Sequence, residues 1–399
     1  MSYTVLARKY RPQAFEEMTG QEHVVRTLEN AIKLGRVSHA YLFAGPRGVG
    51  KTTAARLLAR ALNCEKGPTA HPCGECRACV EIRDGISTDV AEIDGASNNG
   101  VENVREIREN AKYLPQRDRH KIYIIDEVHM LSGAAFNALL KTLEEPPGHV
   151  KFIFATTEPH KLPDTILSRC QRHNFRRISQ ASMIARLKEI CAKEQVKVSD
   201  SALSLVVRQS EGGMRDALSL LDQIISACGL EPDDTAVAEA LGAIDRNLVQ
   251  AFATGLVRKD AKVLFQRTEE VWNRGLDLER VTEELALMLR HVFVAKTTGA
   301  GPEELADSDR EFAVSLAKEA DAAQLARMFD VIHSAGWEIS RAGQPKLAFE
   351  MTLLKAIYLA PAASIPDLIS RVEQLAGSPQ SRSAPGASGG RSAPPSFRS

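Results

Sequence analysis

The sequence predicts an α/β fold: a parallel-sheet domain in the first half, then a small helical domain, then an all-α domain. Three features of the sequence support this prediction. Short apolar runs alternate with amphipathic stretches up to about residue 179, strand-like runs stop after it, and apolar residues then recur at helical spacing. Continuous apolar runs between helices are typical of βαβ units, whose strands are buried on both faces.

Four apolar runs are predicted to be strands of one buried sheet. Each is short, rich in β-branched or aromatic residues, and bounded by turn residues. These runs are residues 40–45, 90–95, 121–127 and 151–157, and residues 173–178 are a shorter fifth candidate. We therefore expect a first domain over residues 1–178.

Residues 179–242 are predicted to be a small helical domain. Asp200 is a suitable N-cap for its central helix, Gly212 and Gly213 interrupt the helical pattern, and Gly229 ends it. One apolar face of the following helix comprises Leu218, Leu221, Ile224 and Ile225.

Residues 243–360 are predicted to be helical throughout. One stripe there comprises Val281, Leu285, Met288, Leu289 and Val292. Residues 361–399 are expected to be a linker and flexible tail, because the part after residue 378 is rich in Ser, Pro and Gly and lacks acidic residues.

The composition says little about partners, since 51 Lys and Arg balance 51 Asp and Glu. The first residues have no apolar signal core, and no run reaches the roughly 18 apolar residues of a membrane span. We therefore expect a cytoplasmic protein. Thiols stay reduced there, which favours a metal site over disulfides for clustered cysteines.

The stretch "GPRGVGKT" matches the phosphate-binding pattern G-x-x-x-x-G-K-[ST]. It follows a predicted strand and opens the helix predicted over residues 53–62, so backbone N–H groups and the helix N-terminus can cradle phosphates. Lys51 would neutralise the β- and γ-phosphates, and Thr52 would ligate Mg²⁺. The predicted nucleotide-binding residues here are Gly45, Pro46, Arg47, Gly48, Val49, Gly50, Lys51, Thr52 and Thr53.

Two later strand ends carry polar residues suited to the same site. Asp126 can hold Mg²⁺, and the adjacent Glu127 can act as general base toward water. Thr156 and Thr157 end the next strand, where a hydroxyl could orient water or touch the γ-phosphate. The sequence leaves open which of the two threonines does so, and a simple turn is the alternative.

Arginines gather at two places after the sheet. Arg169, Arg172, Arg176 and Arg177 could contact phosphate or DNA, supply an arginine finger, or form a solvated basic face. Arg215 begins a helix behind two glycines, where a cation is electrostatically unfavourable, so we expect it to meet an anion.

Cys64, Cys73, Cys76 and Cys79 have a C-x8-C-x2-C-x2-C spacing that can surround one tetrahedral ion. Zinc is the prediction, and an iron–sulfur cluster or free thiols are the alternatives. Four thiolates would close the zinc shell and make the site structural. The three isolated cysteines, expected to be small core residues, are Cys170, Cys191 and Cys228.

The order of these motifs resembles the AAA+ clamp-loader ATPases, and within them the gamma/tau family of bacterial DNA polymerase III. The stretches that carry the resemblance are "LARKYRPQAFEEMTGQEHV", "HAYLFAGPRGVGKTTAARLLARALNC", "YIIDEVHMLSGAAFNALLKTLEEPP", "ILSRCQ" and "GGMRDALSLLDQ". The resemblance covers about residues 1–360. It implies an ATP-driven subunit that opens a sliding clamp and loads it on primed DNA.

The resemblance also implies residue roles. Asp126 and Glu127 would be the Walker B pair, and Thr156 or Thr157 would be sensor 1. Arg169 of "SRC" would be the finger that reaches a neighbour's ATP. Further implied roles are sensor 2 at Arg215, adenine packing by the N-terminal "LARKYRP", and zinc ligation by the four clustered cysteines.

The resemblance implies partners as well: delta and delta-prime subunits and further gamma/tau copies in a five-subunit ring, the sliding clamp, and primed DNA bound without sequence preference. The helical third domain would be the ring's collar. Helicase and polymerase coupling is doubtful for this short form, because no later domain follows, and we expect no polymerase active site on this chain. A different AAA+ motor, or a zinc-bearing scaffold with a vestigial nucleotide site, are the alternatives.

Overall fold

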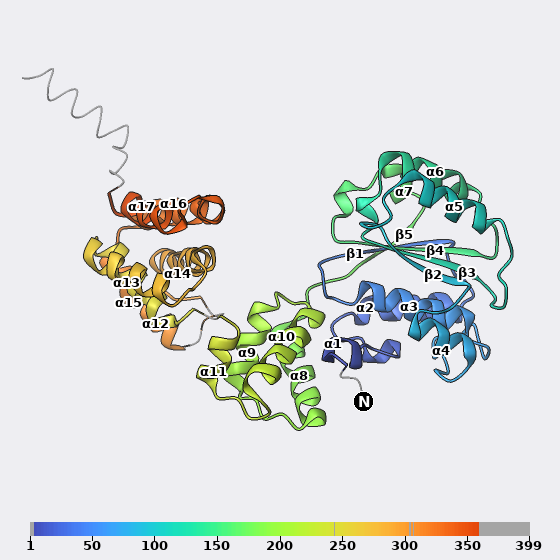
Figure 1. The fold of residues 1–399 in the computed structure, drawn as a ribbon, viewed down its shortest axis with the longest axis horizontal. Coiled ribbons are helices and arrows are strands. Elements are labelled where there is room, and N and C mark those ends of the chain that lie inside the picture. The colour runs from blue at the N-terminus through green and yellow to red at the C-terminus, as the bar shows by residue number, and fades with distance from the viewer. Residues whose placement is uncertain (1–3, 243, 303–304, 306, 359–399) are drawn as a thin grey trace, which may run out of the picture. The chain divides into compact units, whose positions relative to one another are not determined.

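The computed structural model describes residues 4–242, 244–302, 305 and 307–358 of the chain. The chain divides between residues 243 and 244 into two compact units. Helices and strands of the first unit carry labels up to α11 and those of the second run from α12 to α17 (Figure 1). The expected tail at 361–399 lies outside the described residues.

A five-stranded parallel sheet forms the centre of the first unit, with strand order β2-β3-β4-β1-β5. The strands are β1 (Ala40–Ala44), β2 (Val90–Asp94), β3 (Lys121–Asp126), β4 (Val150–Thr156) and β5 (Gln171–Asn174). The buried runs predicted from the sequence are therefore sheet strands. β1 lies between β4 and β5, so its C-terminal end has a parallel strand on either side.

The fifth strand differs from the prediction over 173–178: it begins at Gln171 and ends at Asn174. Its pairing with β1 stops at the Ala44–Asn174 pair. The partner strand ends there because the chain turns at Gly45, so no further parallel ladder can form. Phe175 still donates its N–H to the Ala44 carbonyl, at 2.7 Å, before the chain leaves the sheet.

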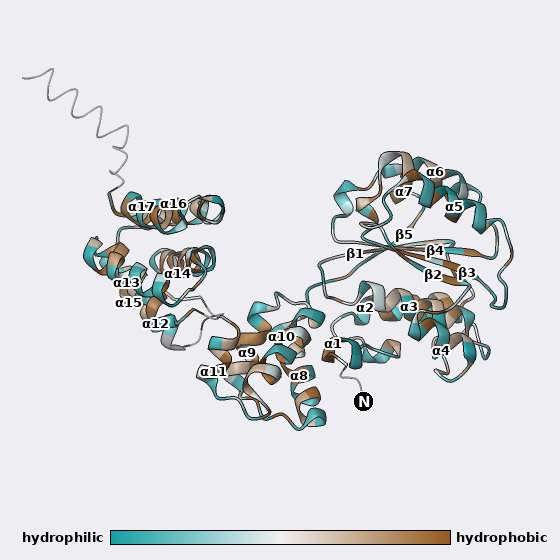
Figure 2. Cartoon of the chain, viewed as in Figure 1, coloured by the Kyte–Doolittle hydropathy of each residue, from teal (hydrophilic) through white to brown (hydrophobic). Residues whose placement is uncertain are grey.

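Helices cover both faces of the sheet (Figure 1). Tyr41 and Phe43 pack into the cluster that contains α3, and Leu42 packs into the cluster that contains α6, as the alternation of side chains along a strand requires. The strands are correspondingly apolar (Figure 2). The remaining elements before residue 168 are α1 (Leu6–Lys9), η1 (Phe15–Glu17), α2 (Glu22–Lys33), α3 (Lys51–Asn63), α4 (Arg77–Asp84), α5 (Val101–Ala111), η2 (Val128–Met130), α6 (Gly133–Glu144), η3 (Pro159–Lys161) and α7 (Asp164–Leu167).

A group of four helices completes the first unit: α8 (Gln180–Glu194), α9 (Asp200–Gln209), α10 (Met214–Cys228) and α11 (Asp234–Ala240). The predicted N-cap at Asp200 is wrong by one residue. Ser199 caps α9, because its side chain accepts the Ala202 N–H, and Asp200 is the first helical residue, where its charge suits the helix N-terminus. Gly229 ends α10 with a φ of 82°, as predicted.

The second unit is helical in all its described elements: α12 (Arg246–Val257), α13 (Ala261–Asn273), α14 (Leu278–Thr298), α15 (Asp307–Glu319), α16 (Ala322–Arg341) and α17 (Pro345–Tyr358). The predicted apolar stripe lies on α14, and all five of its residues are buried in one cluster with α12 and α16. Within the described residues no helix combines the length and apolar character that a membrane span requires.

Candidate nucleotide-binding site and cysteine cluster

The loop between β1 and α3 has the backbone that a phosphate-binding loop needs. Gly48 and Gly50 adopt φ values of 74° and 102°, a left-handed region that favours glycine. Gly50 is the N-cap of α3 and no side chain caps that helix. The first N–H groups of α3 therefore point into the loop, where an anion can accept them.

Lys51 is buried, with 6% of its surface exposed, although it carries a charge. Its Nζ donates to the carbonyls of Gly45, at 2.8 Å, and Pro46, at 2.7 Å. Burial lowers the pKa of Lys51, and the nearby carboxylates of Glu127 and Asp126 oppose that effect. The ammonium is thus held over the loop by the loop's own carbonyls.

The P-loop helix and the end of β3 meet through two side chains. Thr52 Oγ1 donates to Asp126 Oδ2 at 2.6 Å, and the Glu127 N–H donates to Asp126 Oδ1 at 2.9 Å. A hydroxyl and a carboxylate oxygen so placed are the ligand types that Mg²⁺ prefers. Glu127 has φ 44°, a left-handed conformation that is uncommon for any residue other than glycine.

The two threonines at the end of β4 have different surroundings. Thr157 donates to Glu127 Oε2 from its hydroxyl, at 3.0 Å, and from its backbone N–H, at 3.3 Å. Thr156 is fully buried and its Oγ1 lies 3.0 Å from His129 Nδ1. Thr157 is therefore the one beside the acidic pair, a distinction that the sequence left open.

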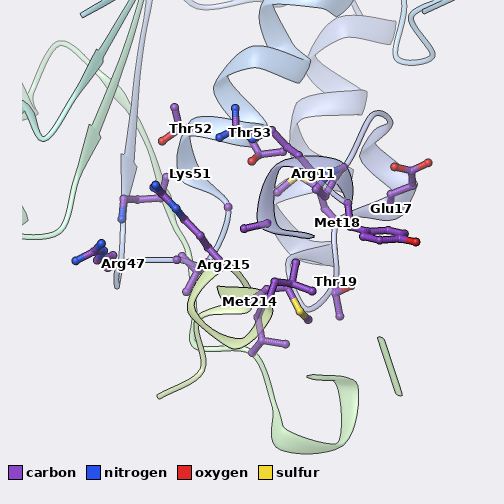
Figure 3. Close-up of a pocket in the computed structure, with 18 of the residues that line it drawn as sticks. Arg11, Glu17, Met18, Thr19, Arg47, Lys51, Thr52, Thr53, Met214 and Arg215 are labelled. Atoms are coloured by element: carbon purple, nitrogen blue, oxygen red, sulfur yellow. The ribbon is translucent and has the colours of Figure 1, made fainter. Parts of the chain in front are cut away.

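Helix α10 closes the site from the group of helices α8–α11, hereafter the lid. The Arg215 N–H donates to the Gly48 carbonyl at 3.3 Å, so the helix start touches the loop. The approach is close: a Cβ on Gly48 would lie 2.5 Å from Asp216 Oδ2 and 3.1 Å from Gly213 Cα. Arg47, Lys51 and Arg215 line one pocket from different elements (Figure 3).

The pocket continues beyond the loop toward the N-terminal segment and the lid. Arg11, Met18 and Thr19 line it together with Met214 (Figure 3). Only the family resemblance predicted that the segment "LARKYRP" would lie here. Two pocket carboxylates on β2 were not predicted. One lies within the strand and the other at its end, and for the latter its place at a strand end next to β3 was the available signal. The two are, in that order, Glu92 and Asp94.

Arg169 does not line this pocket. Its Nη2 donates to Glu144 Oε1 at 2.7 Å and its Nη1 to the Thr165 carbonyl at 2.7 Å, with the side chain 32% exposed. Arg177 contacts Glu211, and Arg172 and Arg176 are exposed. The four arginines therefore do not form one site: Arg169 is held apart at the end of α7.

The four clustered cysteines converge. Their Sγ atoms all lie within 4.8 Å of one another. Tetrahedral zinc with Zn–S bonds of about 2.3 Å needs sulfurs about 3.8 Å apart, so small side-chain adjustments would suffice. The Cys76 N–H donates to Cys73 Sγ at 3.3 Å, and such backbone bonds, from Cys76 and then Glu75, lower the pKa of Cys73 to about 6. The donor set fits a thiolate-bound metal.

The cysteine cluster continues the P-loop helix. Cys64 is the C-cap residue of α3, and the Thr69 N–H donates back to the Ala61 carbonyl at 3.0 Å. Arg119 donates to the carbonyl of Cys64 at 2.8 Å. Of the isolated cysteines, Cys191 is buried as predicted, whereas Cys170 and Cys228 are only partly buried.

The parallel sheet, the phosphate-binding loop, the acidic pair and the helical lid define a P-loop ATPase of the AAA+ class. Three families match successive parts of the chain: "DNA polymerase III, delta subunit" over residues 20–179, "DNA polymerase III clamp loader subunit, ATPase lid domain" over 183–230, and "DNA polymerase III subunits gamma and tau domain III" over 233–375. The chain belongs to the gamma/tau family of clamp-loader ATPases.

Three relatives give the extent of the similarity. DNA polymerase III subunit tau of Bacillus subtilis is 43% identical over 94% of this chain and 68% of that protein. Subunit tau of Escherichia coli is 42% identical over 92% of this chain and 57% of that protein. Subunit gamma of Buchnera aphidicola is 37% identical over 90% of this chain and 99% of that protein.

Among solved structures, the RuvB branch-migration motor of Thermotoga maritima is 16% identical, with a TM-score of 0.44 over 82% of this chain and 91% of that chain. A likeness this slight has no bearing on function. The chain spans a little over half the length of the Escherichia coli relative.

Proposed function

We propose that the chain binds and hydrolyses ATP·Mg²⁺ to drive opening of a sliding clamp and its loading onto primed DNA. The observation that carries this is the convergence of Lys51, Thr52, Asp126 and Glu127 at the C-terminal ends of β1 and β3, the two parallel strands on either side of β4. ATP or ADP phosphates would lie on the loop N–H groups and Lys51. Thr52 and Asp126 would hold Mg²⁺, and Glu127 would take the proton of the attacking water.

We assign the remaining roles by position. Thr157, which donates twice to Glu127, would be the strand-end sensor rather than Thr156. Arg215 lines the pocket from the lid and would meet the γ-phosphate of its own chain's ATP. Arg169 lies outside that pocket and would complete the site of a neighbouring chain.

The domains then have distinct tasks. Residues 1–178 would be the ATPase core, 179–242 the lid, 243–360 the collar, and 361–399 a linker and tail. The partners would be delta and delta-prime subunits and further copies of this chain in a five-subunit ring. The match to domain III of gamma and tau supports the collar assignment.

ATP would act here as a switch. Contacts from Lys51, Arg215 and a neighbour's Arg169 exist only while the γ-phosphate is present, so ATP would favour the state that grips clamp and DNA, and hydrolysis would release both. DNA contacts would be to the backbone, insensitive to base sequence and weakened by salt. The chain would serve DNA synthesis in the bacterial cytoplasm only as part of the holoenzyme and carry no polymerase site.

The four cysteines would hold one structural zinc ion. Two observations support this assignment: the short distances between the four sulfurs, and the backbone N–H groups that donate to the Sγ atoms of Cys64 and Cys73. With four thiolate ligands no position remains for water, so the ion would stabilise the module that ends α3 and supply no step of hydrolysis.

The test is the ATPase rate of the chain alone, with delta and delta-prime, and with clamp and primed DNA added. We expect low activity alone and at least about tenfold stimulation in the complete mixture, because the finger comes from a neighbour. Glu127→Gln should bind ATP and abolish turnover. A closed six-subunit ring of this chain alone by mass measurement, or absence of stimulation, would overturn the clamp-loader assignment.

A further inference from the structure

His129 lies behind Glu127, outside the residues that line the pocket, and has none of the roles assigned above. It follows the acidic pair in η2, and only 6% of its side chain is exposed. Its Nδ1 lies 3.0 Å from Thr156 Oγ1 and 3.4 Å from Glu127 Oε2, and its Nε2 lies 3.2 Å from Glu158 Oε2. Both nitrogens of a buried ring are therefore engaged by the end of β4.

The two residues that His129 contacts at the end of β4 flank Thr157. Thr156 precedes it and Glu158 follows it, and the Glu158 N–H donates to Thr156 Oγ1 at 3.0 Å. Thr157 itself donates twice to Glu127 Oε2, from its hydroxyl and from its backbone N–H. The imidazole thus fixes the turn on either side of the residue that holds the carboxylate.

The hydrogen-bond directions agree with this role. Thr156 Oγ1 already accepts the Glu158 N–H, so its own proton is available to Nδ1 of His129. The proton on Nε2 then goes to the Glu158 carboxylate. The ring lies against Glu127 Oε2, which also accepts both bonds from Thr157. The other oxygen, Oε1, accepts no hydrogen bond within the described part of the chain, so it is available to water.

We propose that His129 is a positioning residue for hydrolysis: it fixes Thr156 and Glu158 so that Thr157 holds Glu127 with Oε1 toward the attacking water. The proposal rests on the proposed function, in which Glu127 is the base. Displacing a reacting group by about 1 Å can lower a rate by about 100-fold, so a residue that touches neither nucleotide nor metal can still control turnover.

The experiment uses the complete complex with clamp and primed DNA. His129→Ala should lower kcat by about 10- to 100-fold and leave the affinity for a fluorescent ATP analogue within about twofold. His129→Asn places a polar atom near the position of Nδ1, and His129→Gln places one near Nε2. Each should restore part of kcat, and Asn the larger part, because its Oδ1 can accept the Thr156 hydroxyl proton as Nδ1 does.

A double-mutant cycle separates this role from a general one. Since His129 acts through Thr157, His129→Ala should cost little further once Thr157→Val is present. His160→Ala is the control: that histidine lies in η3, its side chain is 73% exposed, and it approaches Glu158 only to 3.8 Å, so this variant should keep the kcat of the natural chain. Melting temperature is measured for every variant, and the Asn and Gln variants keep the test valid should Ala unfold the site.

Three outcomes would overturn the proposal: full kcat in His129→Ala, strictly additive effects in the cycle, or parallel losses of nucleotide affinity and melting temperature that Asn and Gln do not rescue. Glu127→Gln is measured alongside. If that variant turned over normally, the premise about the base would fail, whereas an inactive Glu127→Gln with a fully active His129→Ala rejects the role of His129 alone.

Discussion

Thr52 and Asp126 are joined across 2.6 Å, from the first turn of the P-loop helix to the end of β3. If both are Mg²⁺ ligands, directly or through water, Thr52→Ala and Asp126→Asn should each weaken ATP·Mg²⁺ binding by about 10- to 100-fold. The double variant should be little weaker than either single one, because one shared ion is lost only once. Titration with and without EDTA checks this: an equal loss without Mg²⁺ would argue against a shared ion.

Arg169 should matter to a neighbour's site and not to its own. Arg169→Ala should bind nucleotide within about twofold of the natural chain and lose at least about 100-fold of the stimulated ATPase rate. The measurements are fluorescent-nucleotide titration and steady-state hydrolysis in the reconstituted ring. Arg36→Ala removes an exposed arginine elsewhere. It should leave both the nucleotide affinity and the stimulated ATPase rate unchanged. If clamp and primed DNA still stimulated the ATPase rate of Arg169→Ala, Arg169 would not act on a neighbour's site.

Gly48 should be intolerant of a side chain for a reason that Gly35 does not share. Both have positive φ, so alanine at either costs about 1 kcal/mol of backbone strain. Only at Gly48 would the Cβ meet Asp216 and Gly213, while nothing lies within 4 Å of a Cβ at Gly35. Gly48→Ala should therefore lose at least about tenfold in nucleotide affinity, and Gly35→Ala should keep it.

Asp216→Ala tests the same contact from the lid. Because Asp216 Oδ2 is the nearest atom to the added methyl group, the double variant with Gly48→Ala should recover part of the lost affinity. Isothermal titration measures the ATP affinity of the natural chain, the two single variants and the double variant. No recovery would assign the clash to the Gly213 backbone, which lies 3.1 Å away.

Zinc should support stability and not catalysis. Elemental analysis should find one zinc per chain, and Cys73→Ser or Cys76→Ser should lose it and lower the melting temperature by about 5 °C or more. ATP affinity should stay within about threefold, because the ion contacts no nucleotide. Cys228→Ser, outside the cluster, should keep its zinc. Iron in place of zinc, or unchanged melting after metal loss, would contradict the assignment.

Much of this site follows from strand ends that can be recognised in the sequence. The apolar runs before Gly45, Glu127 and Thr157 are strands of one sheet, so their last residues had to meet at one edge. What the sequence could not give were contacts decided by tertiary packing. The choice between Thr156 and Thr157 depends on how the chain turns after β4, and the role of His129 depends on that same turn.

The backbone of Glu127 has a consequence for how this chain balances stability against activity. A glutamate at φ 44° costs about 1–2 kcal/mol that glycine would not. Folding alone therefore favours glycine at the position where the proposed chemistry requires a carboxylate. A selection for thermal stability alone would therefore favour replacement of Glu127 by glycine. The resulting protein would be more stable and would no longer hydrolyse ATP.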